Sequence, residues 1–143
     1  QTIATSPLFV NADLRVAPAS PGKAARLLAL MDHPTATIYV NLEEAGLLCQ
    51  TTYETSSEGA AGLLKRGAHR VLVTDGGNAA AEGTAGDIIT HTPPAVMVTR
   101  VTGAGDTFMA AHIASEAQGM DRASALTRAS NAAATYVSGE TPL

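Results

Sequence analysis

The hexapeptide Thr-Gly-Ala-Gly-Asp-Thr at residues 102–107 combines two glycines, a carboxylate and the start of an alanine-rich helical pattern. Gly103 and Gly105 allow a ligand to approach the backbone closely, and the free N–H groups of a helix's first turn favour an anion. Asp106 would compete with that anion unless it has a separate purpose, such as taking a proton from an attacking hydroxyl. The pattern therefore indicates phosphoryl transfer at one helix start.

The same hexapeptide also has an ordinary structural explanation. Glycine beside small residues often forms only a tight turn, and an Asp in a first helical turn often serves only as a cap. The Walker-type phosphate loop is excluded because no Gly-Lys-Ser/Thr follows, and Phe108 stands where the dinucleotide motif needs its third glycine. The hexapeptide alone leaves a turn and a phosphate site equally open.

Length and composition limit the class of protein. The 143 residues suffice for one domain with a core of its own, and their formal net charge is −4. This charge and the lack of any Lys/Arg cluster argue against nucleic acid or an anionic membrane as a partner. No apolar run reaches the ~20 residues that span a bilayer, and no signal pattern begins the chain, so we expect a cytoplasmic protein. Cys49 is alone and the four histidines are scattered, so neither residue type indicates a metal site.

Alternating strands and helices are expected to position these residues. The patterns predict strands at 8–12, 38–40, 71–74 and 96–98, a ribbon of 79–82 with 87–91, a loop at 13–19, and helices at 20–31, from 41 onward, 57–66, 104–118 and 122–136. Asn41, with Glu44 three residues later, is close to a capping box, which is a purely structural role. The alternation favours an α/β fold with a mostly parallel sheet and helices on both faces.

Three loops of this predicted fold are expected to converge. Ligands of such sheets bind beyond the carboxyl ends of the strands. Asn41, the loop 74–77 and the loop 102–106 each follow a predicted strand. We therefore expect them to meet along one edge of the sheet and to form a phosphate site.

The order and spacing of these motifs resemble the C-terminal half of the ribokinase-like, or pfkB-type, carbohydrate kinases. Residues 102–106 fit that family's second signature, and Phe108 and Ala110 fit its usual continuation. Further similarities are Asn-x-x-Glu at 41–44, the Thr-x-Gly nucleotide loop at 74–76 and the late helix near the adenine at 130–134. The resemblance implies a ribokinase-like three-layer fold, C-terminal part only, with residues 1–143 as a single domain and as a fragment of a longer chain.

The resemblance also implies an ATP-dependent phosphotransferase that acts on a hydroxyl of a small sugar or nucleoside. Asp106 would take the proton of that hydroxyl as it attacks the γ-phosphate of ATP. The amides of Gly103, Ala104 and Gly105 would stabilise the charge that builds on the transferred group.

The remaining site residues follow from the same resemblance. Glu44 would act on Mg²⁺ by way of water, and Asn41 would orient that network or the phosphates. Thr74 and Gly76 would shape the nucleotide pocket, with Asn131 beside the base.

Two positions depart from the family pattern. Arg100 replaces an Asp that usually helps to hold a monovalent cation, so a bound potassium ion is not expected. One hypothesis is that the Arg100 guanidinium replaces some of the missing positive charge, and the alternative is a solvated Arg at a strand end. Ala79 occupies the place of a second glycine in the nucleotide loop, which would weaken nucleotide affinity.

The identity of the substrate stays open, because the family holds the sugar mostly with an N-terminal half that is not in this sequence. Stretches at 20–24, 41–45 and 137–142 look most like the pseudouridine kinase branch, with ribokinase, fructokinase and other nucleoside kinases as alternatives. A different class of function is a non-catalytic nucleotide-binding or interaction module, because half a pocket cannot exclude water or orient an acceptor. Exposed sheet edge and apolar surface would favour a homodimer or larger species.

Overall fold

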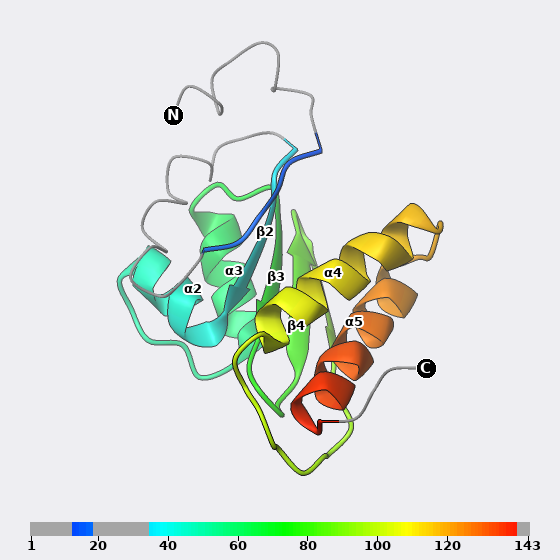
Figure 1. The fold of residues 1–143 in the computed structure, drawn as a ribbon. Coiled ribbons are helices and arrows are strands. Elements are labelled where there is room, and N and C mark those ends of the chain that lie inside the picture. The colour runs from blue at the N-terminus through cyan, green and yellow to red at the C-terminus, as the bar shows by residue number, and fades with distance from the viewer. Residues whose placement is uncertain (1–12, 19–34, 140–143) are drawn as a thin grey trace.

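The sheet and its helices form three layers in the computed structural model, which describes residues 13–18 and 35–139 (Figure 1). Its strands are β1 (Arg15–Val16), β2 (Thr37–Asn41), β3 (Arg70–Thr74), β4 (Ala80–Thr84) and β5 (Asp87–His91), hydrogen-bonded in that order. The helices are α2 (Leu42–Cys49), α3 (Ser56–Lys65), α4 (Ala104–Ala117) and α5 (Arg122–Val137). Strands β1, β2 and β3 pair in parallel, and β4 pairs antiparallel with both β3 and β5, so β4 alone runs against the other described strands. This confirms the predicted α/β class with a mostly parallel sheet.

Side chains of the central strands alternate between two apolar cores. Ile38 and Val40 of β2 pack in the core beneath α2 and α3, whereas Tyr39 between them packs with Phe108 of α4. Leu72 on β3 joins Tyr39 on this second face. Because successive side chains of a strand point to opposite faces, a sheet covered on both faces needs apolar residues at nearly every central position.

Most predicted elements are confirmed, and two predictions are wrong. Part of the predicted loop 13–19 forms strand β1, which pairs with the start of β2. The apolar run 96–98 forms no strand: Met97 is 83% exposed, and the N–H groups of Thr99 and Arg100 that follow it bond to the carbonyl of Val137 on α5. The predicted strand 8–12 and helix 20–31 lie outside the described residues. None of the helices in the described ranges is long and apolar enough to cross a membrane.

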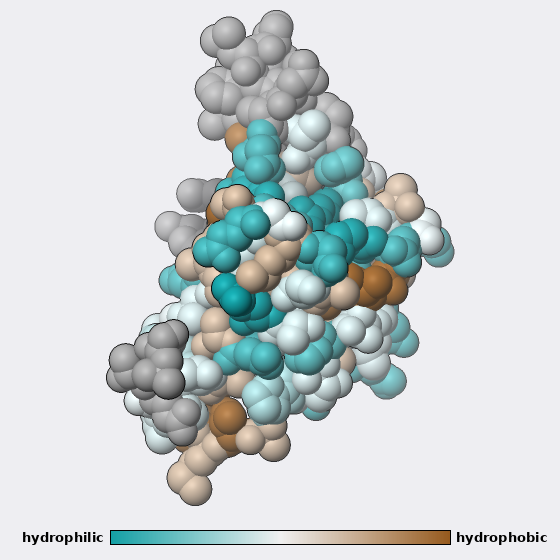
Figure 2. Space-filling model, turned by 90° about the vertical axis from the view of Figure 1, so that its right-hand side faces the viewer, coloured by the Kyte–Doolittle hydropathy of each residue, from teal (hydrophilic) through white to brown (hydrophobic). Residues whose placement is uncertain are grey.

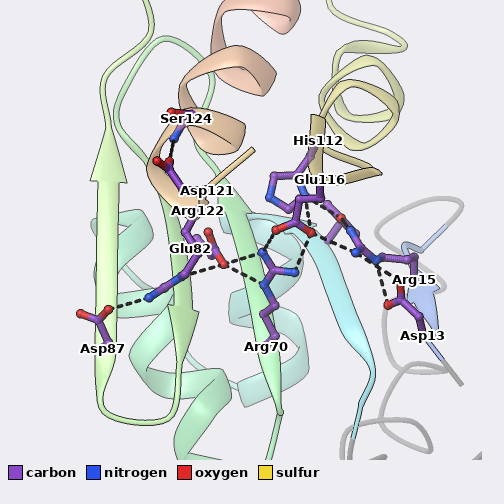
Figure 3. A network of polar contacts seen from close by, with 11 residues as sticks. Asp13, Arg15, Arg70, Glu82, Asp87, His112, Glu116, Asp121, Arg122 and Ser124 are labelled. Atoms are coloured by element: carbon purple, nitrogen blue, oxygen red, sulfur yellow. Dashed lines mark hydrogen bonds and ion pairs between the residues drawn. The ribbon is translucent and has the colours of Figure 1, made fainter. Parts of the chain in front are cut away.

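A network of ion pairs fixes the end of α4 and the start of α5 to the sheet (Figure 3). Glu82 of β4, fully buried, accepts hydrogen bonds from Arg70 at 2.7 Å and from Arg122 at 3.1 Å. Arg70 also donates to Glu116 of α4 at 2.8 Å. Burial alone would raise the pKa of Glu116, but the hydrogen bond from Arg70 and the charges of its basic neighbours outweigh it and lower that pKa to about 2. The Glu116 carboxylate is therefore ionised at neutral pH and holds α4 against β3.

A second branch of this network orients the rest of α4. Arg15 donates to the Tyr39 hydroxyl at 2.8 Å, and that hydroxyl lies 2.8 Å from Nδ1 of His112. Burial lowers the pKa of His112, so the imidazole is neutral at neutral pH. The imidazole stacks on Phe108 with ring centroids 6.3 Å apart. These contacts set the position of the N-terminal half of α4, on which the predicted anion site lies.

Candidate active site

A pocket of about 350 Å³ lies beyond the carboxyl end of β3. Four segments form its walls: the loop after β3, the segment between β5 and α4, the first turns of α4 and the C-terminal half of α5. Figure 1 shows the segment between β5 and α4 running beside the end of α5, where Thr99 bonds to Val137. This volume falls within the range of small-molecule sites.

The pocket has an apolar side and a side of open backbone. The apolar side chains are those of Ala80, Val98, Val101, Phe108, Ala133, Ala134 and Val137. On the other side Gly76, Gly77 and Gly105 expose their backbone, and a Cβ placed on any of them would meet no atom within 4 Å. Such a pocket suits a ligand with an apolar ring at one end and an anionic group at the other.

The turn before α4 requires glycine at position 103. Gly103 has φ 97°, and a Cβ there would lie 2.5 Å from the hydroxyl of Tyr136. The N–H of Ala104 donates to the carbonyl of Val101 at 3.0 Å, although Ala104 itself lines the pocket. In the described part of the chain, the N–H groups of Gly105 and Asp106 have no acceptor, as expected for a first helical turn.

Asp106 lies in this first turn of α4, next to the pocket wall. Its neighbour Gly105 lines the pocket, but Asp106 itself does not. The side chain is exposed, and its carboxylate has no hydrogen bond or ion pair with any described residue. Such a carboxylate is available to accept a proton from a bound molecule.

Asn41 and Glu44 form the capping box of α2. The Asn41 side chain accepts from the N–H of Glu44, and the Glu44 carboxylate accepts from the N–H of Asn41, both at 2.8 Å. Burial raises the pKa of Glu44, while the bond from Asn41 opposes that shift. Asn41 pairs with Thr74 across the parallel strands, so the box lies beside the strand end that starts the loop 74–78. Neither Asn41 nor Glu44 lines the pocket. Of the three loops predicted to converge, the one at Asn41 therefore lies next to the site without forming part of its wall.

The remaining predicted residues divide between the pocket and the surface. Thr74 and Gly76 line the pocket, whereas Asn131 is exposed and does not. Ser130, which the sequence reasoning missed, lines it instead: the residue is 3% exposed, and its Oγ has no hydrogen-bond partner among the residues described. The spacing of Leu126 and Ala129 on the buried face of α5 places position 130 on that face and could have identified Ser130.

The sequence pattern does not reveal the segment between β5 and α4 as a pocket wall, because its apolar residues have the pattern of a strand. Pro93, Pro94, Val96, Val98 and Val101 all line the pocket. The proline pair is the signal that could have corrected this, since a Pro-Pro dipeptide marks a loop. Figure 2, which looks onto the α4–α5 side, shows hydrophobic side chains at the lower end of the molecule, where Figure 1 places this segment.

The chain was also compared with known protein families and sequences. The profile described as pfkB family carbohydrate kinase matches residues 4–141. No curated protein sequence matches the chain.

Solved kinase structures share the fold. The ribokinase of Thermotoga maritima is 20% identical, with a TM-score of 0.76 over 90% of this chain and 43% of that one. The adenosine kinase of Sinorhizobium meliloti is 19% identical, with a TM-score of 0.75 over 86% of this chain and 38% of that one. A putative ribokinase II from E. coli, solved in complex with ATP and Mg²⁺, is 28% identical, with a TM-score of 0.67 over 82% and 37% of the two chains. The chain thus spans about two fifths of the length of these kinases.

Proposed function

The chain belongs to the pfkB family of carbohydrate kinases, and on this premise we propose that it binds ATP and supplies the base that activates a sugar or nucleoside hydroxyl. The observation that carries the proposal is the pocket, which joins an apolar wall to open glycine backbone at a helix start. The ATP and Mg²⁺ in the similar E. coli structure support the choice of ligand.

In this proposal the two sides of the pocket bind the two ends of ATP. The adenine lies against the apolar wall of Phe108, Ala133 and Val137, where its flat faces lose contact with water. The phosphates lie over Gly76 and Gly105, since a Cβ at either position would enter the open space beside the backbone. The helix dipole of α4 favours the phosphate charge at its N-terminus.

Asp106 is the proposed general base. As the acceptor hydroxyl attacks the γ-phosphate, the carboxylate takes its proton, and the bond from the γ-phosphorus to the ADP oxygen breaks. The free N–H groups of Gly105 and Asp106, with that of Gly103, stabilise the negative charge on the transferred group. Ala104, also expected to contribute, already donates its N–H to Val101, so its contribution requires that bond to open.

Mg²⁺ fits this site as an ion held mainly by phosphates and water. Within residues 13–18 and 35–139, no group of three or more His, Cys, Asp or Glu side chains could hold a metal by itself. Mg²⁺ does not need such a group, because it usually keeps several waters and binds through one or two carboxylates plus substrate phosphates. One oxygen of Glu44 serves the capping box, and the other is proposed to accept from a metal-bound water. When bound, the ion neutralises phosphate charge.

The proposed acceptor is held outside this chain. Residues 1–143 are proposed to form the nucleotide and catalytic-base half, with the acceptor held by further residues of a longer kinase. The first-guess acceptor is a pseudouridine-like nucleoside or ribose. For the isolated chain a second function is nucleotide binding without turnover, because the exposed Asp106 carboxylate is open to water there and no described residue orients an acceptor beside it.

A panel assay tests the proposal. The isolated chain is expected to bind ATP in a calorimetric titration and to transfer no phosphate. The proposed longer kinase is expected to convert ATP to ADP with one or more members of a panel of sugars and nucleosides. Phosphorus NMR then identifies the phosphorylated product. Binding of ATP by the longer protein without transfer to any member would favour the non-catalytic module instead.

Ser130 provides a test of where the adenine of ATP lies. Its hydroxyl is buried without a partner, so Ser130→Ala is expected to leave the free protein equally stable or more stable by about 1 kcal/mol. If the hydroxyl bonds to the adenine, the same change weakens ATP binding by on the order of fivefold to tenfold. Urea denaturation and calorimetry measure the two effects. Unchanged ATP affinity in Ser130→Ala would place the adenine elsewhere. The control is Ser124→Ala, at the start of α5 and outside the pocket wall.

A further inference from the structure

The residues around Arg100 do not fit the monovalent cation that the resemblance to pfkB-type kinases implies. The carbonyl of Thr102 accepts from the Tyr136 hydroxyl at 2.6 Å, and the carbonyl of Tyr136 accepts from Nε of Arg100 at 2.7 Å. The carbonyl of Val137 accepts from the N–H groups of Thr99 at 2.6 Å and Arg100 at 3.1 Å. A potassium ion needs such oxygens as ligands, and a guanidinium beside them would repel it.

Tyr136 connects the charge of Arg100 to the glycine turn. The guanidinium carbon lies 3.9 Å from the centroid of the Tyr136 ring, in a cation–π contact. The hydroxyl of the same ring bonds to Thr102 and lies against Gly103, where a Cβ would be 2.5 Å away. One aromatic side chain at the end of α5 therefore contacts both the positive charge and the turn that starts α4.

The bond to Thr102 also fixes the direction of an amide. The carbonyl of Thr102 and the N–H of Gly103 belong to one planar trans peptide group, so they point in opposite directions. Because the Tyr136 hydroxyl holds that carbonyl, it also holds the Gly103 N–H pointing away from the ring. The N–H of Gly103 is one of the proposed anion-binding groups, so the contact with Tyr136 fixes the direction in which that N–H points.

We propose that Arg100 and Tyr136 together replace the monovalent cation: Arg100 supplies a fixed positive charge beside the anion site, and Tyr136 positions the turn. Tyr136 is a positioning residue and Arg100 acts through its charge, and this inference rests on the proposed binding of ATP at the glycine turn. The pair is part of the folded chain, so the site is ready for phosphate without potassium.

Calorimetric titrations of the whole chain test the pair. ATP and adenosine are each titrated without potassium and with 100 mM potassium chloride, the ionic strength being held constant with tetramethylammonium chloride. The unaltered chain is expected to bind ATP equally, within twofold, in both solutions. Arg100→Gln is expected to weaken ATP on the order of tenfold, as expected for one partly screened charge, and to leave adenosine within twofold. Tyr136→Phe keeps the ring beneath the guanidinium and is expected to weaken ATP by about threefold to tenfold, the worth of one hydrogen bond.

The control is Arg128→Gln, which removes an exposed positive charge from α5 at a position outside the pocket wall. Equal losses in Arg100→Gln and Arg128→Gln would overturn the inference, as would a fivefold or larger gain in ATP affinity on adding potassium to the unaltered chain. Equal losses for ATP and adenosine would show that Arg100 only maintains the fold. Failure of the unaltered chain to bind ATP would overturn the proposed function and this inference with it, whereas the other outcomes leave the proposed function intact.

Discussion

Asp106→Asn is expected to lower kcat for phosphate transfer by about 10² to 10⁴, the contribution of a positioned general base. The amide has the shape of the carboxylate but cannot take the proton of the attacking hydroxyl. The KM for ATP is expected to stay the same or fall slightly, because a negative charge beside the phosphates has been removed. This division between kcat and KM is the signature of an interaction made in the transition state.

The measurement is a steady-state assay of ADP release by the proposed longer kinase, with its best acceptor from the panel. Glu58→Gln is the matched control, since Glu58 is also an exposed acid in the first turn of a helix but belongs to α3, where it accepts from the N–H of Glu54 away from the pocket wall. A kcat for Asp106→Asn within fivefold of the unaltered enzyme would mean that another group takes the proton.

Glu82→Gln is expected to destabilise the fold by about 3 kcal/mol, near the lower end of the cost of removing one partner of a buried ion pair. Glu82 is 0% exposed and accepts from both Arg70 and Arg122. When Glu82 loses its charge, the partly buried Arg70 keeps its ion pair with Glu116, and Arg122 keeps its ion pair with the partly exposed Asp87. The loss of stability is expected near the lower end of that range because each arginine retains one acidic partner.

Urea denaturation of the chain measures this loss, with Asp87→Asn as the control. Asp87 pairs with the same Arg122, but its side chain is 58% exposed, so its removal is expected to cost about 0 to 1 kcal/mol. Similar losses in the two variants would show that burial of Glu82 adds nothing to the strength of its pairs.

Local patterns in the sequence were sufficient for most of the secondary structure. The apolar run of β3 predicted a buried strand, and Asn41 with Glu44 predicted the start of α2, because both patterns depend on residues no more than four positions apart. Strand β1 escaped prediction because its two residues gain their conformation from pairing with β2, 22 positions later, since Arg15 pairs with Thr37 and Val16 with Ile38. The run 96–98 has the local pattern of a strand, yet it lines a pocket, because no strand of the described sheet pairs with it.

The sequence by itself determined the α/β class, the kinase family and the glycine turn at Asp106, because motif spacing and hydrophobic period are properties of neighbouring residues. Tertiary structure decided which side chains meet at the site. It turned Ser130 rather than Asn131 toward the pocket, and it brought Arg100 against Tyr136, 36 positions away. Those outcomes depend on how α5 packs against α4 and the sheet, and the rotation of a packed helix is set by the whole of its buried face rather than by any one of its residues.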